Sequence, residues 1–177
     1  MALLEITTLP DPVLRRKARK IAVVDKELQP LIDNMIETMR AAPGVGLAAP
    51  QVAQSIRLIV VEYGQENEEG EEAEPKKLFA VINPEIVLAS EEKEMGIEAC
   101  LSIPGLAGEV ERHSAIVIKG LNRYGKPTRI KAEGWLARIF QHEIDHLDGV
   151  LYIDKLVSKD TLRRVQEGTE EAAEAIG

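Results

Sequence analysis

Residues 142–146 read His-Glu-Ile-Asp-His, and this motif constrains the fold more than any other feature of the chain. On a helix, residues four apart lie on one face, so both imidazoles can reach one metal ion. Apolar residues recur around the motif at helical spacing, which predicts a helix over 134–147 that ends near Gly149. Glu143 falls within the apolar arc of this helix, where a carboxylate is costly unless it has a partner or a purpose. The motif therefore predicts a metal-binding helix with Glu143 beside the metal's open position, able to handle a proton.

The remaining faces of the predicted helix indicate what surrounds it. Arg138, Gln141 and Asp145 share one side, which we expect to face solvent or another polar surface. Trp135 and Ile139 fall near the histidine side, so both are candidates for apolar walls of a substrate site near the metal. The helix is thus expected to meet the core on one side and polar groups on the other.

Two histidines do not complete a catalytic metal site, which usually has three protein ligands and one open position. Cys100 is the single cysteine, which excludes an intrachain disulfide and fits a reducing compartment. A thiolate binds soft or borderline metals strongly and adds charge that two neutral imidazoles lack. His113 competes for the same role, but it lies beside Arg112 between expected strands, where a structural or exposed histidine is more common. We therefore predict Cys100 as the third ligand.

A segment rich in glycine and alanine precedes these ligands, at residues 44–51, and reads Gly-Val-Gly-Leu-Ala-Ala-Pro-Gln. Such small residues indicate close approach of the backbone to a ligand or to another strand. The segment is not a phosphate loop, because it lacks a Lys-Ser/Thr ending and no strand clearly leads into it. Taken alone, it leaves the approaching group open.

The order of the expected elements predicts the fold class. A chain of 177 residues is long enough for one domain with its own core. Strands and helices are segregated more than alternated, which favours an α+β fold over a doubly wound sheet. The expected elements are a helix over 25–39 capped by Asp25, strands over 57–61 and 78–86, a hairpin of 115–121 with 128–133, the helix over 134–147, a short strand over 150–153 and a terminal helix over 158–175.

The net charge of −8 is local rather than spread over the chain. Two segments without Lys or Arg, 62–74 and 167–174, hold eleven of the 30 acidic residues, so the remainder is close to neutral. We expect residues 63–77 to form an exposed acidic loop. The chain shows no apolar run of membrane-spanning length and no signal-peptide pattern, so we expect a cytoplasmic protein without membrane partners. We expect no DNA partner either.

The three segments together resemble the peptide deformylase family, which carries G-x-G-x-A-A-P-Q, E-G-C-L-S and Q-H-E-x-D-H in this order. The corresponding residues here are 44–51, 98–102 and 141–146, and the resemblance extends from about residue 9 to residue 156. Three ordered motifs make this match highly specific.

One departure from the family pattern is Ala99, which stands where the family has Gly. The added methyl would strain the backbone if φ at this position were positive. The resemblance further implies one catalytic domain over 1–177, with antiparallel or mixed sheets packed around a central metal-binding helix. A C-terminal helix and tail would occupy residues 158–177.

The resemblance also implies a role for each motif residue. The enzyme would remove the formyl group from N-formylmethionyl peptides and nascent chains, releasing formate. The implied metal ligands are Cys100, His142 and His146, and the implied general base and acid is Glu143. The implied oxyanion donors are the Gln51 side chain and the Leu101 backbone N–H. The substrate would be aligned as an added strand by Gly44, Val45, Gly46 and Leu47.

The resemblance implies one divalent metal ion per chain, with Fe²⁺ expected in the cell. Zn²⁺ or another divalent metal also suits two imidazoles and a thiolate. Because the family acts on nascent chains, transient contact with the ribosome is a further expectation. The basic run over 15–20 and a second group formed by Lys155, Lys159, Arg163 and Arg164 are candidate docking surfaces, although solvated faces are the commoner role of such runs.

Three other functions compete with this interpretation. A metallopeptidase that cuts internal bonds would need a third ligand downstream, and no histidine follows His146. A binding module stabilised by a metal would usually have four protein ligands rather than three. A degenerate deformylase homologue without activity would be marked by Ala99.

Overall fold

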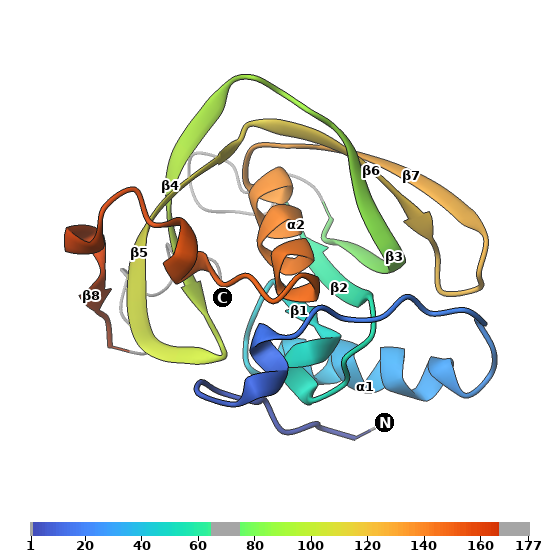
Figure 1. Ribbon diagram of the computed structural model, residues 1–177. Helices are drawn as coiled ribbons and strands as arrows, with labels where there is room; N and C mark the ends of the chain where they lie inside the picture. The colour runs from blue at the N-terminus through green and yellow to red at the C-terminus, as the bar shows by residue number, and fades with distance from the viewer. Residues whose placement is uncertain (1, 65–74, 167–177) are drawn as a thin grey trace.

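Helix α2 (Gly134–Leu147) lies at the centre of the molecule and contacts strands of two antiparallel sheets (Figure 1). The computed structural model describes residues 2–64 and 75–166. Ten of the fourteen residues of α2 are buried, so the helix is covered around most of its circumference. This arrangement confirms the predicted α+β fold with sheets around the central helix.

The larger sheet has five strands in the order β1-β2-β3-β6-β7, and every neighbouring pair is antiparallel. Strand β2 lies inside the sheet, and its first four residues are buried, as expected for a continuous apolar run. Strand β1 is an edge strand, with β2 as its neighbour. The strands are β1 (Gly46–Ala48), β2 (Leu58–Tyr63), β3 (Lys77–Ala89), β6 (Ala115–Leu121) and β7 (Pro127–Glu133).

The smaller sheet has three strands, β4 (Lys93–Cys100), β5 (Ile103–His113) and β8 (Arg163–Arg164), in the order β4-β5-β8. Strands β4 and β5 form a long hairpin with its turn directly after Cys100. Strand β5 of this hairpin contacts α2, and the hairpin arches beside the helix in Figure 1. The hairpin was not predicted, because its residues alternate too irregularly between polar and apolar to read as strands.

Helix α1 (Leu28–Ala41) confirms the predicted first helix. The N-cap is Glu27, without a side-chain cap, rather than the predicted Asp25; the Asp25 carboxylate lies two residues earlier and accepts hydrogen bonds from the backbone N–H groups of Glu27 and Leu28. Pro30 lies in the first turn, where its missing N–H costs little. The buried face of α1 packs in one apolar cluster with residues of β1 and β2, and this cluster supports β1 from beneath.

Helix α2 begins and ends where the sequence predicts. Its apolar residues Ile139, Phe140, Ile144 and Leu147 pack in a cluster with residues of the larger sheet. Gly149 follows with a φ of 73°, and a Cβ there would lie 2.5 Å from the carbonyl oxygen of Arg15, so glycine is required on both counts. No helix in the two described ranges is both long and apolar enough to cross a membrane.

Two expected elements near the C-terminus are wrong. Residues 150–153 do not form a strand; the 3₁₀-helix η3 (Tyr152–Lys155) takes their place. The helix expected from residue 158 is replaced, as far as residue 166, by the 3₁₀-helix η4 (Lys159–Thr161) and by β8, which pairs with Leu106 and Ala107 of β5. Tertiary pairing with β5 thus overrides the local helical pattern. The rest of that predicted helix and most of the acidic loop lie outside the described residues.

Two smaller expectations are also resolved. The sheets are antiparallel rather than mixed; the one parallel pairing in the described residues is an isolated bridge between Arg19 and Ile56. Ala99 does not have a positive φ, since the described non-glycine residues that do are Ala53 and Asn83. The methyl of Ala99 therefore imposes no left-handed strain beside Cys100.

Two further 3₁₀-helices, η1 (Pro12–Arg15) and η2 (Ala49–Val52), complete the described elements.

Candidate metal centre

The end of β4 and the second half of α2 bring Cys100, His142 and His146 together. Their ligand atoms all lie within 4.8 Å of one another, and the Cys100 Sγ is 3.4 Å from the His146 Nε2. All three side chains are buried. His113 lies elsewhere: its Nδ1 is 2.7 Å from the backbone oxygen of Ser90. The structure thus brings together the three predicted ligands and leaves out the competing histidine.

The cluster fits a divalent cation. The His142 Nε2 is buried and has no hydrogen-bond partner among the described atoms. A buried polar atom without a partner costs free energy, and a metal ion would satisfy it. Two imidazoles and one thiolate form a donor set that binds zinc and iron well.

The other nitrogen of His142 is held by Glu98, a residue of β4. The His142 Nδ1 is 2.9 Å from Glu98 Oε1, so the carboxylate orients the ring and leaves Nε2 facing the cluster. Burial alone would raise the pKa of Glu98. Hydrogen bonds from Arg112 and His142 outweigh burial and hold the pKa of this carboxyl well below its usual value. Glu98 therefore remains an ionised acceptor.

Two arginines neutralise Glu98. Arg112 of β5 donates from Nε and Nη2 to the two carboxylate oxygens at 2.9 and 2.8 Å, and its Nη1 also reaches Asp145. Arg138 of α2 donates to Glu98 Oε2 at 2.7 Å. A buried carboxylate can stay charged only with such partners, so these contacts maintain the acceptor for His142.

Most of the polar side of α2 is buried rather than solvated, and Asp145 is partly exposed. Arg138 and Gln141 are 4% and 5% exposed, and the second of the two expectations for this face, another polar surface, is correct. Gln141 accepts the backbone N–H of His113 and donates to its carbonyl oxygen. The β4–β5 hairpin supplies the polar surface that covers this side.

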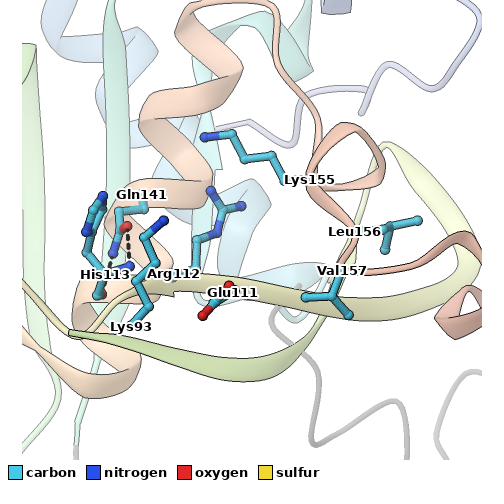
Figure 2. A pocket seen from close by; sticks show the side chains of 8 residues that line it. All are labelled: Lys93, Glu111, Arg112, His113, Gln141, Lys155, Leu156 and Val157. Atoms are coloured by element: carbon cyan, nitrogen blue, oxygen red, sulfur yellow. Dashed lines mark hydrogen bonds between the residues drawn. The ribbon is translucent and has the colours of Figure 1, made fainter. Parts of the chain in front are cut away.

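A pocket of about 400 Å³ opens beside this covered face, and none of the three cluster residues lines it (Figure 2). Figure 2 shows His113 and Gln141, joined by hydrogen bonds, at one end of it. Carboxylates partly balance the positive charge of the basic residues in this pocket: Lys155 Nζ lies 3.3 Å from Asp145, and Glu111 is one of the lining residues. The lining residues are Lys93, Glu111, Arg112, His113, Gln141, Lys155, Leu156 and Val157.

Glu143 is buried beside the cluster. Its Oε1 is 3.8 Å from the His142 Nε2, and its Oε2 has no hydrogen-bond partner among the described atoms. Burial raises the pKa of Glu143 to about 7, against the opposing influence of His142. A carboxyl with a pKa near neutrality can both accept and give a proton at cellular pH.

Gly46 of β1 provides the space for Glu143. A Cβ at this position would lie 2.8 Å from the Glu143 Cγ, closer than side-chain atoms pack. The close approach at Gly46 is therefore to the acidic side chain of α2, whereas the small residues predicted a ligand or another strand. At Gly44, a Cβ would meet the Leu101 side chain at 3.1 Å, a looser contact with a movable group.

The Gln51 side chain has one defined orientation. Its Oε1 accepts the backbone N–H of Ala48 at 2.9 Å, so Nε2 points the other way, toward the Cys100 Sγ at 3.6 Å and the Ser102 hydroxyl at 3.2 Å. Leu101 follows Cys100 directly, in the turn of the β4–β5 hairpin. An amide donor and the backbone of this turn thus lie next to the cluster.

The two predicted wall residues have different environments. Ile139 is 2% exposed and belongs to the apolar cluster around α2. Trp135 is 40% exposed, and the Arg138 guanidinium carbon lies 5.5 Å from its ring centroid. Trp135 is therefore available for contact with a ligand, whereas Ile139 mainly supports the helix.

The roles of Glu98, Arg112 and Arg138 were missed in the sequence. Glu98 is two residues from the proposed ligand Cys100, which is a weak signal by itself. The two arginines contact Glu98 across 14 and 40 residues of sequence, and nothing in the local pattern indicates such contacts. The polar stripe on α2 was the available signal, because a stripe of this kind needs either solvent or buried partners.

Comparison with known proteins places these features in a family. Residues 3–162 match the family model described as Polypeptide deformylase. A curated peptide deformylase of Halothermothrix orenii is 53% identical over 157 residues, covering 89% of this chain and 96% of that protein. One from Dehalococcoides mccartyi is 47% identical over 165 residues, covering 93% of each.

Solved structures agree. The crystal structure of peptide deformylase from Thermotoga maritima is similar with a TM-score of 0.80 at 42% identity, covering 88% of this chain and 99% of that chain. A Met-Ala-Ser-bound class I type b peptide deformylase from Acinetobacter baumannii has a TM-score of 0.80 at 34% identity, covering 87% of this chain and 98% of that chain.

Proposed function

Because the chain belongs to the polypeptide deformylase family, we propose that the cluster of Cys100, His142 and His146 is the centre at which it acts. The enzyme removes the N-formyl group from the formylmethionine of newly made polypeptides and releases formate. One observation carries the assignment to this centre: three buried ligand atoms within 4.8 Å of one another, beside the free oxygen of Glu143.

One divalent metal ion would be held by the Cys100 thiolate and by the two imidazoles. When bound, it supplies Lewis acidity toward water and the formyl carbonyl. Fe²⁺ is proposed as the ion in the cell, because members of the family commonly use it, and the same donor set also suits Zn²⁺.

The residues around the cluster would divide the remaining work. Glu143 would accept a proton from the attacking water and deliver it to the amine that leaves. The Gln51 Nε2 and the Leu101 backbone N–H would donate to the oxygen on which negative charge develops. The fixed orientation of the Gln51 amide supports this role, since a donor that is already in place needs no reorganisation.

Strand β1 would align the substrate. It is one of the two edge strands of the larger sheet, so a peptide could extend the sheet along β1 and the two residues before it, that is along Gly44, Val45, Gly46 and Leu47. Exposed Trp135 would contribute apolar surface for the methionine side chain, and buried Ile139 would contribute through its packing in the apolar cluster that supports α2. The Met-Ala-Ser peptide named for the Acinetobacter relative is the kind of product that this arrangement would hold.

Formate release from formyl-Met-Ala-Ser tests the proposal. Protein purified without oxygen and loaded with Fe²⁺ should release formate and Met-Ala-Ser, and Zn²⁺-loaded protein serves as the comparison for the choice of metal. Acetyl-Met-Ala-Ser is the matched control substrate and should be left intact. Absence of formate from fully metal-loaded protein would favour a degenerate homologue.

The oxyanion role predicts a specific effect of Gln51→Leu. Loss of the amide donor should lower kcat about 10²- to 10³-fold, with metal content unchanged. Gln54→Leu, which replaces an exposed glutamine three residues away, should leave kcat as in the wild type. Steady-state formate release and metal analysis compare the two variants with the wild type. An unchanged kcat in Gln51→Leu would show that this side chain does not stabilise the oxyanion.

Ribosome contact through the basic run is a further proposal. Arg16 and Lys17 are exposed and free to meet an acidic surface, whereas Arg15 already pairs with Asp154. Reversing both charges should weaken co-sedimentation with ribosomes at low salt, where exposed charges are least screened. Reversal of exposed Lys131 on β7 is the control, and equal binding of all three proteins would speak against this surface.

A further inference from the structure

The Arg138 guanidinium occupies a buried site in which several oxygen acceptors surround it. Its guanidinium donates to the backbone oxygens of Val110 and Glu94 at 2.8 and 2.6 Å, in addition to its bond with the Glu98 carboxylate. The side chain is 5% exposed. All three acceptors belong to the β4–β5 hairpin, so this one side chain joins α2 to both strands of the hairpin.

Gly96 of β4 leaves the room that this guanidinium occupies. A Cβ on Gly96 would lie 2.6 Å from the Arg138 Cζ and 2.7 Å from its Nε. The guanidinium could move away only by giving up hydrogen bonds to the hairpin. The absence of a side chain at Gly96 therefore allows the Arg138 guanidinium to lie against β4.

The Glu98 carboxylate is held from two directions. Arg112 approaches from β5 and contacts both oxygens, whereas Arg138 approaches from α2 and contacts Oε2 alone. The remaining interaction of Oε1 is with the His142 Nδ1. Arg138 stands four residues before His142 on the same helix. The contacts of Glu98 with Arg138 and with His142 therefore bridge one turn of α2.

We infer that Arg138 is a positioning residue for the metal centre, which fixes Glu98 relative to α2 and thereby fixes the imidazole of His142. The inference rests on the proposed role of His142 as a metal ligand. Arg112 holds the same carboxylate from β5 with two hydrogen bonds, and its Nη1 also reaches α2 at Asp145, three residues after His142. Arg138 adds a second link from α2, one turn before His142, because it bonds the Glu98 carboxylate and one backbone oxygen in each strand of the hairpin.

Metal affinity is the direct measurement. Arg138→Met keeps the length of the side chain and removes the donors; we expect it to bind Zn²⁺ or Co²⁺ about 10- to 100-fold more weakly in competition with a chelator. The absorption spectrum of the Co²⁺-loaded variant should also shift, since the ligand field changes with the orientation of His142. Arg138→Lys, which keeps the charge and one donor to Glu98, should recover part of the affinity.

Arg57→Met is the matched control. Arg57 also holds α2, through the Leu147 carbonyl oxygen and Asp148 at the C-terminal end, yet it has no bond to Glu98. It should lower the thermal stability of the metal-free protein while leaving metal affinity unchanged. A similar loss of affinity in Arg57→Met would reduce Arg138 to a general stabiliser of the helix.

Gly96→Ala tests the same link from the hairpin side. The new methyl displaces the guanidinium without changing any charge, so metal affinity should again fall. In the Arg138→Met background the same change should cost much less, because the group that it displaces is already gone. Additive losses would contradict the inference.

The outcomes separate this inference from the proposed function. If the wild-type protein bound no metal, the proposed metal centre itself would be contradicted. Wild-type protein that binds metal, together with Arg138→Met and Arg138→Lys that bind it equally well, would overturn the positioning role alone. If Arg138→Met does not fold, Arg138→Lys and Gly96→Ala still decide the question.

Discussion

Glu143→Gln is expected to lower kcat/KM for formyl-Met-Ala-Ser by about 10²- to 10⁴-fold while the metal stays bound. Glutamine keeps the size of the side chain in the space beside Gly46 but cannot accept or return a proton. The cluster residues are unchanged, so metal content should match the wild type. Formate release and metal analysis on the same preparation give both quantities.

The control for this prediction is Glu111→Gln, the same substitution at an exposed residue of β5. It should leave kcat/KM at the wild-type value. If Glu143→Gln retained most of its activity, Glu143 would be a structural acid, and another group would have to move the proton. If it lost metal as well as activity, Glu143 would belong to the ligand set.

Cys100→Ser is expected to lose most of its bound metal and, with it, nearly all activity. A serine hydroxyl remains protonated at neutral pH, so the centre loses a negative charge and a soft donor together. The buried Sγ lies 3.4 Å from the His146 Nε2, the chain has no second cysteine, and no aspartate or glutamate among the described residues joins the ligand cluster to replace it. Metal content after dialysis, measured beside formate release, tests the expectation.

The thermal stability of the metal-free protein is the internal control for Cys100→Ser. Serine is smaller than cysteine and fits the same space, so the metal-free forms of variant and wild type should unfold within a few degrees of each other. A variant that folds normally and still retains its metal would favour the metallopeptidase alternative, in which the third ligand is a different residue.

The elements that local patterns define were predicted closely. Helix α2 has its predicted bounds, and α1 begins three residues after its predicted start, with Glu27 rather than Asp25 as its N-cap. Both helices depend on periodicity and end signals within about fifteen residues, which a sequence displays directly. Strand β2 was found in the same way, as a continuous apolar run.

The elements that depend on distant partners were not predicted. The β4–β5 hairpin is stabilised by pairing between strands and by contact with α2, and the alternation of its residues is weak. Residues 158–166 carry a helical pattern, yet Arg163 and Arg164 pair with β5. A sequence pattern reports local preference, and here the energy of tertiary pairing exceeds it.

The sequence by itself determined which candidate groups for the proposed centre would lie together. Helical spacing puts His142 and His146 on one face with Glu143 beside them, and ligand chemistry selects Cys100. Only the tertiary structure decided how these groups are held. The hairpin covers the polar side of α2 and carries Glu98 to His142, so Arg138 and Gln141 became buried supports rather than solvated residues. The physical reason is that a buried carboxylate needs charged partners close in space, and their separation along the chain leaves no periodic trace.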